Sequence, residues 1–144
     1  MRSLGYAACS CLRGMRAGQS VLVVDSDTVY SRALAALLRR SGVRVRLART
    51  RTQALVLARN QRFDLAVVDL FLGGGGVELA RELSRRVPRL LLSLGARMGG
   101  QELLEAALGF PVRRKVALPG LLSVAGPGSP KRRSGQQIDL DGVK

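Results

Sequence analysis

Short apolar runs alternate along the chain with segments of helical periodicity, and this alternation limits the possible folds more than any other feature. Residues 21–24 and 65–68 are apolar at every position, which is typical of strands buried on both faces. The connections between successive runs are too long for hairpins, so we expect crossovers and a mostly parallel sheet covered by helices on both faces. The expected strands are residues 21–24, 43–47, 65–68, 90–92 and 112–116.

Helices are expected between these strands. Residues 29–40 place leucines on one face and arginines near the C-terminal end, and Gly42 ends the segment. Thr50 or Thr52 can cap the next helix, which ends near Asn60. Further helices are expected around residues 79–83, at residues 101–108 and from Pro119 to about Val124.

The two ends of the chain differ in composition from its middle. Residues 1–18 contain basic but no acidic residues and lack the long apolar stretch of a signal peptide, so we expect a flexible basic leader. Residues 19–125 form the expected domain, and residues 126–144 have the composition of a disordered basic tail. No window approaches the roughly 18 apolar residues of a membrane span, and Cys9 and Cys11 suit free thiols. We therefore expect a cytoplasmic protein without membrane insertion.

The charge balance and the absence of histidine restrict the chemistry. The chain has 24 Lys and Arg against 10 Asp and Glu, a formal charge of +14, which favours anionic partners. The arginines are spread along the chain and aromatic residues make up only 3%, so nucleic-acid binding is the least favoured function. Without histidine, the chain has no Ser-His-Asp catalysis, no histidine-ligated metal and no phosphohistidine of its own.

Polar residues stand where the expected strands end. Asp25 follows the first strand, Asp69 the third, Ser93 the fourth, and Lys115 lies in the fifth. The carboxyl ends of parallel strands meet at one edge of a sheet, so these side chains should converge there. Clustered carboxylates favour a hard divalent cation such as Mg²⁺. A carboxylate nucleophile with Mg²⁺, a lysine and a hydroxyl suits the uptake of a phosphoryl group as an aspartyl phosphate.

The segments around these residues resemble the receiver domains of two-component response regulators. The resemblance is carried by residues 21–27 (VLVVDSD), residues 63–70 (FDLAVVDL), residues 88–93 and Lys115, and it covers roughly residues 19–125. It implies an α/β, flavodoxin-like (CheY-like) fold, a doubly wound five-stranded parallel sheet with strand order 2-1-3-4-5. It also implies a bacterial, stand-alone phosphorelay signalling domain, which is not an enzyme.

The resemblance further implies a role for each strand-end residue. Asp69 would accept a phosphoryl group from the phosphohistidine of a sensor histidine kinase or a phosphotransfer protein. Lys115 would pair with Asp69 and then with its phosphoryl group. Ser93 would turn toward the phosphoryl oxygens and switch a surface that contacts an output protein.

A magnesium site is implied as well. Asp25, Asp69 and the backbone carbonyl of Phe71 would hold Mg²⁺, with Asp27 as a further candidate ligand. Receivers commonly carry two adjacent acids after the first strand, and here Ser26 replaces the second one, which weakens the site.

Further departures from the family pattern keep alternatives open. Leu94 stands where a small residue commonly follows the switch hydroxyl, Val116 replaces the proline after the lysine, and Val112 replaces an aromatic residue. The main alternative is a degenerate receiver that acts as a phosphorylation-independent interaction module, and the second is a basic nucleic-acid-associated protein. The shortened last helix also suggests a homodimer formed through exposed apolar surface.

Overall fold

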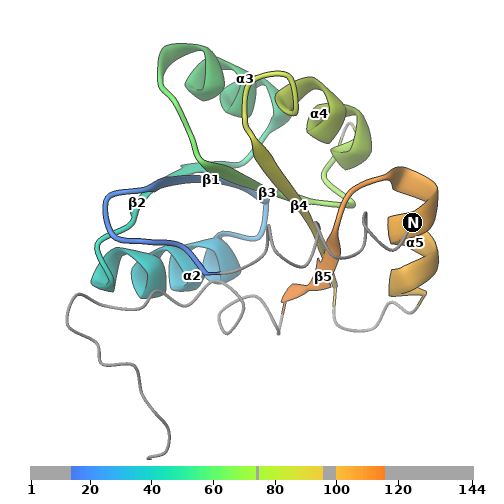
Figure 1. Ribbon diagram of the computed structural model, residues 1–144, viewed down its shortest axis with the longest axis horizontal. Helices are drawn as coiled ribbons and strands as arrows, with labels where there is room; N and C mark the ends of the chain where they lie inside the picture. Colours follow the sequence, from blue (N-terminus) through green and yellow to red (C-terminus); the bar gives the residue numbers. More distant parts are fainter. Residues whose placement is uncertain (1–13, 74, 96–99, 116–144) are drawn as a thin grey trace, which may run out of the picture.

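A parallel sheet forms the centre of the molecule. The computed structural model describes residues 14–73, 75–95 and 100–115, and five parallel strands lie in the order β2-β1-β3-β4-β5 (Figure 1). The predicted flavodoxin-like topology is thereby confirmed. The strands are β1 Ser20–Val24, β2 Arg44–Ala48, β3 Leu65–Asp69, β4 Arg89–Leu94 and β5 Val112–Arg114.

Helices connect these strands and begin at residues that suit helix N-termini. Asp27 caps α2 by accepting a hydrogen bond from the Tyr30 amide, and Thr50, rather than Thr52, caps α3 through the Gln53 amide. No helix among the described residues is long and apolar enough to cross a membrane. The helix expected from Pro119 lies outside the described residues. The described helices are α2 Thr28–Arg40, α3 Arg51–Asn60, α4 Gly76–Leu83 and α5 Gln101–Leu108.

Alternate strand residues face opposite layers of the fold. Val21 and Val23 belong to one apolar cluster, which includes the buried face of α2. Leu22 and Val24 belong to the other cluster, which includes buried residues of α3 and α4 and against which α5 packs. Figure 1 shows α2 below the sheet and α3 and α4 above it. Because both faces are covered, the central residues of the inner strands are apolar, as their sequences indicated.

Part of the expected leader packs against the α2 side of the sheet. Residues 1–13 lie outside the described residues, but residues 14–18 of the expected leader are described, and Met15 is only 2% exposed within the α2-side cluster. The Gly18 amide donates to the Gly42 carbonyl at 2.9 Å, which ties this segment to the turn before β2. The sequence did not predict that Met15 is buried, because a single methionine among arginines and small residues forms no periodic apolar pattern.

Candidate functional site

The strand-end residues singled out in the sequence lie at the carboxyl edge of the sheet. Asp25 directly follows β1, and its amide extends the ladder to the Ala48 carbonyl at 3.0 Å. Asp69 ends β3 and stands in register with Ser93 of β4, while Lys115 directly follows β5. The parallel topology therefore carries residues that are far apart in the sequence to one site.

Lys115 bridges the two aspartates. Its Nζ lies 2.8 Å from Oδ2 of Asp25 and 3.8 Å from Oδ2 of Asp69. The expected pairing with Asp69 is present, but the shorter contact is with Asp25. Asp25 is only 1% exposed, so its charge has the greater need for a nearby cation.

The carboxylate of Asp25 is partly satisfied by backbone. Its Oδ1 accepts a hydrogen bond from the Asp27 amide at 2.9 Å. Its Oδ2 is buried and accepts no well-aligned hydrogen bond from the described residues, so the Lys115 ammonium contacts it through charge and proximity. A buried carboxylate oxygen without an aligned hydrogen-bond donor can bind a hard cation as well as an ammonium group.

Asp27 caps a helix at this edge. Its Oδ1 accepts a hydrogen bond from the Tyr30 amide at 3.1 Å and so caps α2. Ser26, which stands where receivers commonly have their second acid, is exposed. Among the described residues, no three Asp, Glu, Cys or His side chains form a group that could hold a metal.

The chemistry of the donor set nevertheless fits one divalent cation in part. Asp25 and Asp69 supply carboxylates from neighbouring strands, and Asp25 supplies a buried oxygen without an aligned donor. Phe71, whose backbone carbonyl is the third expected ligand, lies two residues beyond Asp69, and its side chain is exposed. Two carboxylates and a carbonyl leave several positions to water, which Mg²⁺ retains readily.

Asp69 lies in an environment that disfavours its charge. Burial raises the pKa of the Asp69 carboxyl above its ordinary value, and the negative charge of Asp25 raises it further. The Lys115 ammonium and the Phe71 amide, which donates to Oδ1 at 3.2 Å, act in the opposite direction without cancelling the increase. A cation placed beside both aspartates would relieve this repulsion.

Tyr30 belongs to the site although sequence reasoning did not select it. Lys115 Nζ lies 5.1 Å from the centroid of the Tyr30 ring, and the Tyr30 hydroxyl donates to the Lys115 backbone carbonyl at 3.4 Å. Burial and the charges of Asp25, Asp69 and Asp27 raise the pKa of the Tyr30 phenol, which stays protonated. The sequence did offer one indication that Tyr30 lies near the site. It is in the first turn of the helix that follows Asp25, and that turn lies at this edge of the sheet.

The backbone around Asp69 is closely packed. Gly76, the first residue of α4, lies so near the carbonyl groups of Asp69 and Leu70 that a Cβ atom there would collide with them. Gly76 is the last of four consecutive glycines, residues 73–76, and this composition does not indicate the contact. On the neighbouring strand, Ser93 is 1% exposed, and its Oγ lies 3.5 Å from the Val68 carbonyl. Leu94, which follows it, is fully buried.

The fold has counterparts among solved structures. A response regulator receiver protein from Burkholderia phymatum superposes with a TM-score of 0.61 at 25% identity, covering 76% of this chain and 98% of that one. A response regulator from Burkholderia pseudomallei, solved with a phosphorylated aspartic acid, a calcium ion and citrate, has a TM-score of 0.58 at 29% identity. That match covers 67% of this chain and 58% of the other. A CheY-like receiver domain protein from Methanospirillum hungatei (TM-score 0.60, 24% identity, covering 71% of this chain and 85% of that one) shares the fold.

Sequence comparison leads to the same family. A curated response regulator receiver protein from Anaeromyxobacter sp. (strain Fw109-5) is 33% identical over 108 residues, which are 72% of this chain and 45% of the relative. The chain thus spans less than half the length of that relative. The family model for the response regulator receiver domain matches residues 21–107, which include Asp25, Asp69 and Ser93. The chain therefore belongs to the response regulator receiver domain family, a family of signalling domains.

Proposed function

We propose that this receiver accepts a phosphoryl group on Asp69 from the phosphohistidine of a sensor histidine kinase or a phosphotransfer protein. The observation that carries the proposal is the juxtaposition of Asp69, Asp25 and Lys115 at one sheet edge, with the ammonium 2.8 Å and 3.8 Å from the two carboxylates. A carboxylate nucleophile beside a fixed cation is the arrangement that phosphoryl uptake requires. Because the sequence contains no histidine, this chain cannot supply the phosphohistidine donor and fits the acceptor position in such a relay.

In the proposed reaction, an oxygen of Asp69 attacks the phosphorus of the donor. The new oxygen–phosphorus bond forms as the phosphorus–nitrogen bond breaks, and the donor imidazole departs and takes up a proton from water. The Lys115 ammonium already contacts both carboxylates, so it is placed to stabilise the negative charge of the phosphoryl oxygens once they are bound to Asp69. The ring of Tyr30 packs beside this ammonium and limits its movement.

Asp25, Asp69 and the Phe71 carbonyl would hold Mg²⁺, which when bound supplies positive charge opposite the phosphoryl oxygens. Asp27 stays with the helix it caps, so this site has one carboxylate fewer than a site with two adjacent acids. We therefore expect weak Mg²⁺ binding and phosphoryl uptake that requires a high Mg²⁺ concentration.

Ser93 is the proposed link between the site and the surface. It stands in register with Asp69, and among the described residues its hydroxyl donates only to the Val68 carbonyl, at 3.5 Å, a weak bond that a phosphoryl oxygen could replace. The chain would then signal to an output protein in the cytoplasm of a bacterial cell. Ser93→Ala should keep phosphoryl uptake and lose the conformational response, measured as amide chemical-shift changes in β4 and β5.

The test is incubation of the full chain with acetyl phosphate over a range of Mg²⁺ concentrations, followed by intact-mass measurement. We expect one added phosphoryl group, absent in Asp69→Asn. Asp64→Asn is the matched control, because Asp64 lies at the opposite end of the same strand region and accepts a hydrogen bond from the Ser20 amide, which asparagine can also accept. An equal adduct in Asp69→Asn, or none in the wild type at any Mg²⁺ concentration, contradicts the proposal.

One set of observations favours the alternative of a phosphorylation-independent interaction module. Lys115 lies 1.0 Å nearer to Asp25 (2.8 Å) than to Asp69 (3.8 Å). The described residues also hold no group of three acids for a metal. In this function the Lys115–Asp25 pair would be a fixed structural link between the ends of β5 and β1 across the edge of the sheet. The same mass experiment separates the two functions, because the module gains no phosphoryl group.

A further inference from the structure

The open edge of the sheet at β2 has backbone groups that point outward. β2 pairs only with β1 among the described strands. The Arg44 amide donates to the Gln19 carbonyl, and the Ala48 carbonyl accepts from the Asp25 amide, so alternate residues of β2 direct their peptide groups to β1. Val45 and Leu47, which lie between them, direct theirs to the outer edge.

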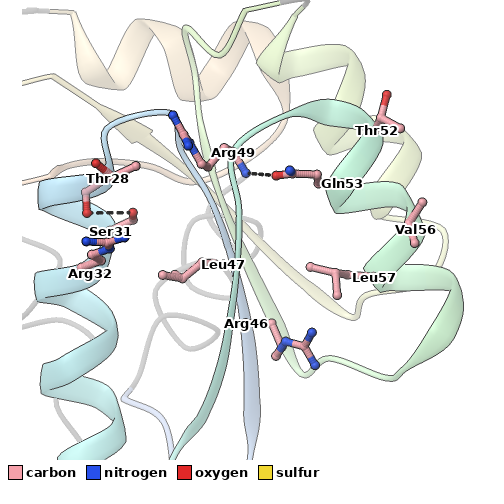
Figure 2. A pocket seen from close by; sticks show the side chains of 10 residues that line it. All are labelled: Thr28, Ser31, Arg32, Arg46, Leu47, Arg49, Thr52, Gln53, Val56 and Leu57. Atoms are coloured by element: carbon pink, nitrogen blue, oxygen red, sulfur yellow. Dashed lines mark hydrogen bonds between the residues drawn. The ribbon is translucent and has the colours of Figure 1, made fainter.

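Only part of this edge is covered. The Arg39 guanidinium donates to the Val45 carbonyl at 2.6 Å and so occupies the edge at that residue. At Leu47 the edge opens into a groove of about 550 Å³ between α2 and α3. Figure 2 shows β2 running between these helices, with the Leu47 side chain toward α2, the Arg46 side chain on the α3 side, and Leu57 of α3 pointing back toward β2. A strand edge in a groove is the feature to which an extended peptide can add.

The walls of the groove have a definite chemistry. Leu47, Val56 and Leu57 form an apolar part, and the Val56 side chain is 46% exposed. Arg32, Arg46 and Arg49 contribute guanidinium groups from α2, β2 and the segment that follows β2, and no acidic residue lines the groove. The occupant that complements these walls is anionic and partly apolar.

A second copy of the chain does not meet this requirement. Pairing of β2 with its counterpart would bring the exposed side chains of Arg44 and Arg46 toward like charges, which is destabilising. A nucleic-acid backbone would satisfy the guanidinium groups but would leave the apolar wall and the strand edge unused. An acidic protein segment with apolar side chains satisfies all three features.

We propose that the groove between α2 and α3 binds an extended segment of a partner protein that contains acidic and apolar side chains, and that this segment adds as a further strand beside Leu47. The Arg49 amide already donates to Gln53 Oε1 at 2.7 Å, so backbone hydrogen bonds at Leu47 provide part of the affinity, and the arginines select for acidic side chains. The surface lies on the opposite edge of the sheet from β5.

The experiment measures fluorescence anisotropy of a labelled short peptide of alternating glutamate and valine on adding the full chain. Arg46→Glu combined with Arg49→Glu should weaken binding by at least about tenfold. Arg59→Glu combined with Arg85→Glu is the matched control, because it changes the net charge equally at exposed arginines outside the groove. The neutral pair Arg46→Gln and Arg49→Gln should also weaken binding, and circular dichroism verifies that each variant is folded.

Three further probes distinguish strand addition from general charge attraction. The same peptide with alternate N-methylated residues should bind weakly, because it cannot pair with β2. Hydrogen exchange at the Leu47 amide should slow when the unmodified peptide is bound. The proposal is overturned if both arginine-to-glutamate pairs weaken peptide binding equally, if the methylated peptide binds as tightly as the unmodified one, or if no saturable binding occurs at any salt concentration. It is also overturned if a short DNA duplex binds more tightly than the peptide and this binding depends on Arg46 and Arg49.

Discussion

Replacement of Gly76 by alanine tests how α4 is seated against the strand that carries Asp69. A Cβ atom at this position would lie 2.6 Å from the Leu70 carbonyl oxygen and 2.9 Å from the Leu70 carbonyl carbon, and it would also collide with the Asp69 carbonyl. These are backbone atoms and cannot rotate away, so the helix must shift. Overpacking of this kind costs about 1–3 kcal/mol. Reduced freedom of the unfolded chain offsets about 0.4–1 kcal/mol of this cost, which leaves a net loss of roughly 0–2.6 kcal/mol.

Gly73→Ala is the matched control three residues earlier in the same segment. Nothing lies within 4 Å of the added methyl group, and the Gly73 backbone is outside the left-handed region. This variant should therefore gain about 0.4–1 kcal/mol, and the two variants should differ by the collision cost of about 1–3 kcal/mol in urea unfolding. If Gly76→Ala is as stable as Gly73→Ala, the close seating of α4 on the Asp69 carbonyl is contradicted.

Other substitutions test the caps, the core and the ion pair. Asp27→Ala and Thr50→Ala should each lower the free energy of unfolding by about 1 kcal/mol, since each removes a helix cap, and an unchanged urea midpoint contradicts the assignment. Leu92→Ala should cost about 2–5 kcal/mol because Leu92 is fully buried, whereas Leu103→Ala, at a side chain 77% exposed, should stay within about 0.5 kcal/mol. Lys115→Met should cost about 3 kcal/mol by calorimetry, because the buried carboxylate beside it loses its cation; wild-type stability would refute this.

The fold could be predicted because its signals are local. Continuous apolar runs such as residues 21–24 and 65–68 indicate strands covered on both faces, and their spacing requires crossovers. The edge that gathers Asp25 and Asp69 then follows from parallel topology alone. The approximate place of the site was therefore available from the sequence.

The contacts within the site could not be predicted in the same way. The shorter distance from Lys115 to Asp25 than to Asp69 depends on burial of the Asp25 carboxylate, which sequence spacing does not report. The packing of Tyr30 on the lysine joins residues that are distant in the sequence, and the close approach of Gly76 to the Asp69 carbonyl depends on how α4 is seated against β3. Such contacts have no periodicity, so only the three-dimensional arrangement reveals them.

The central claim is that Asp69 is the residue that takes up the phosphoryl group. The most direct measurement is borohydride reduction of the chain after treatment with acetyl phosphate and Mg²⁺, followed by peptide sequencing by tandem mass spectrometry. Reduction converts an aspartyl phosphate to homoserine and leaves free aspartate unchanged. We predict homoserine at residue 69 and aspartate at residues 25, 27 and 64. Homoserine at any of those three residues, or aspartate at all four, would contradict the claim.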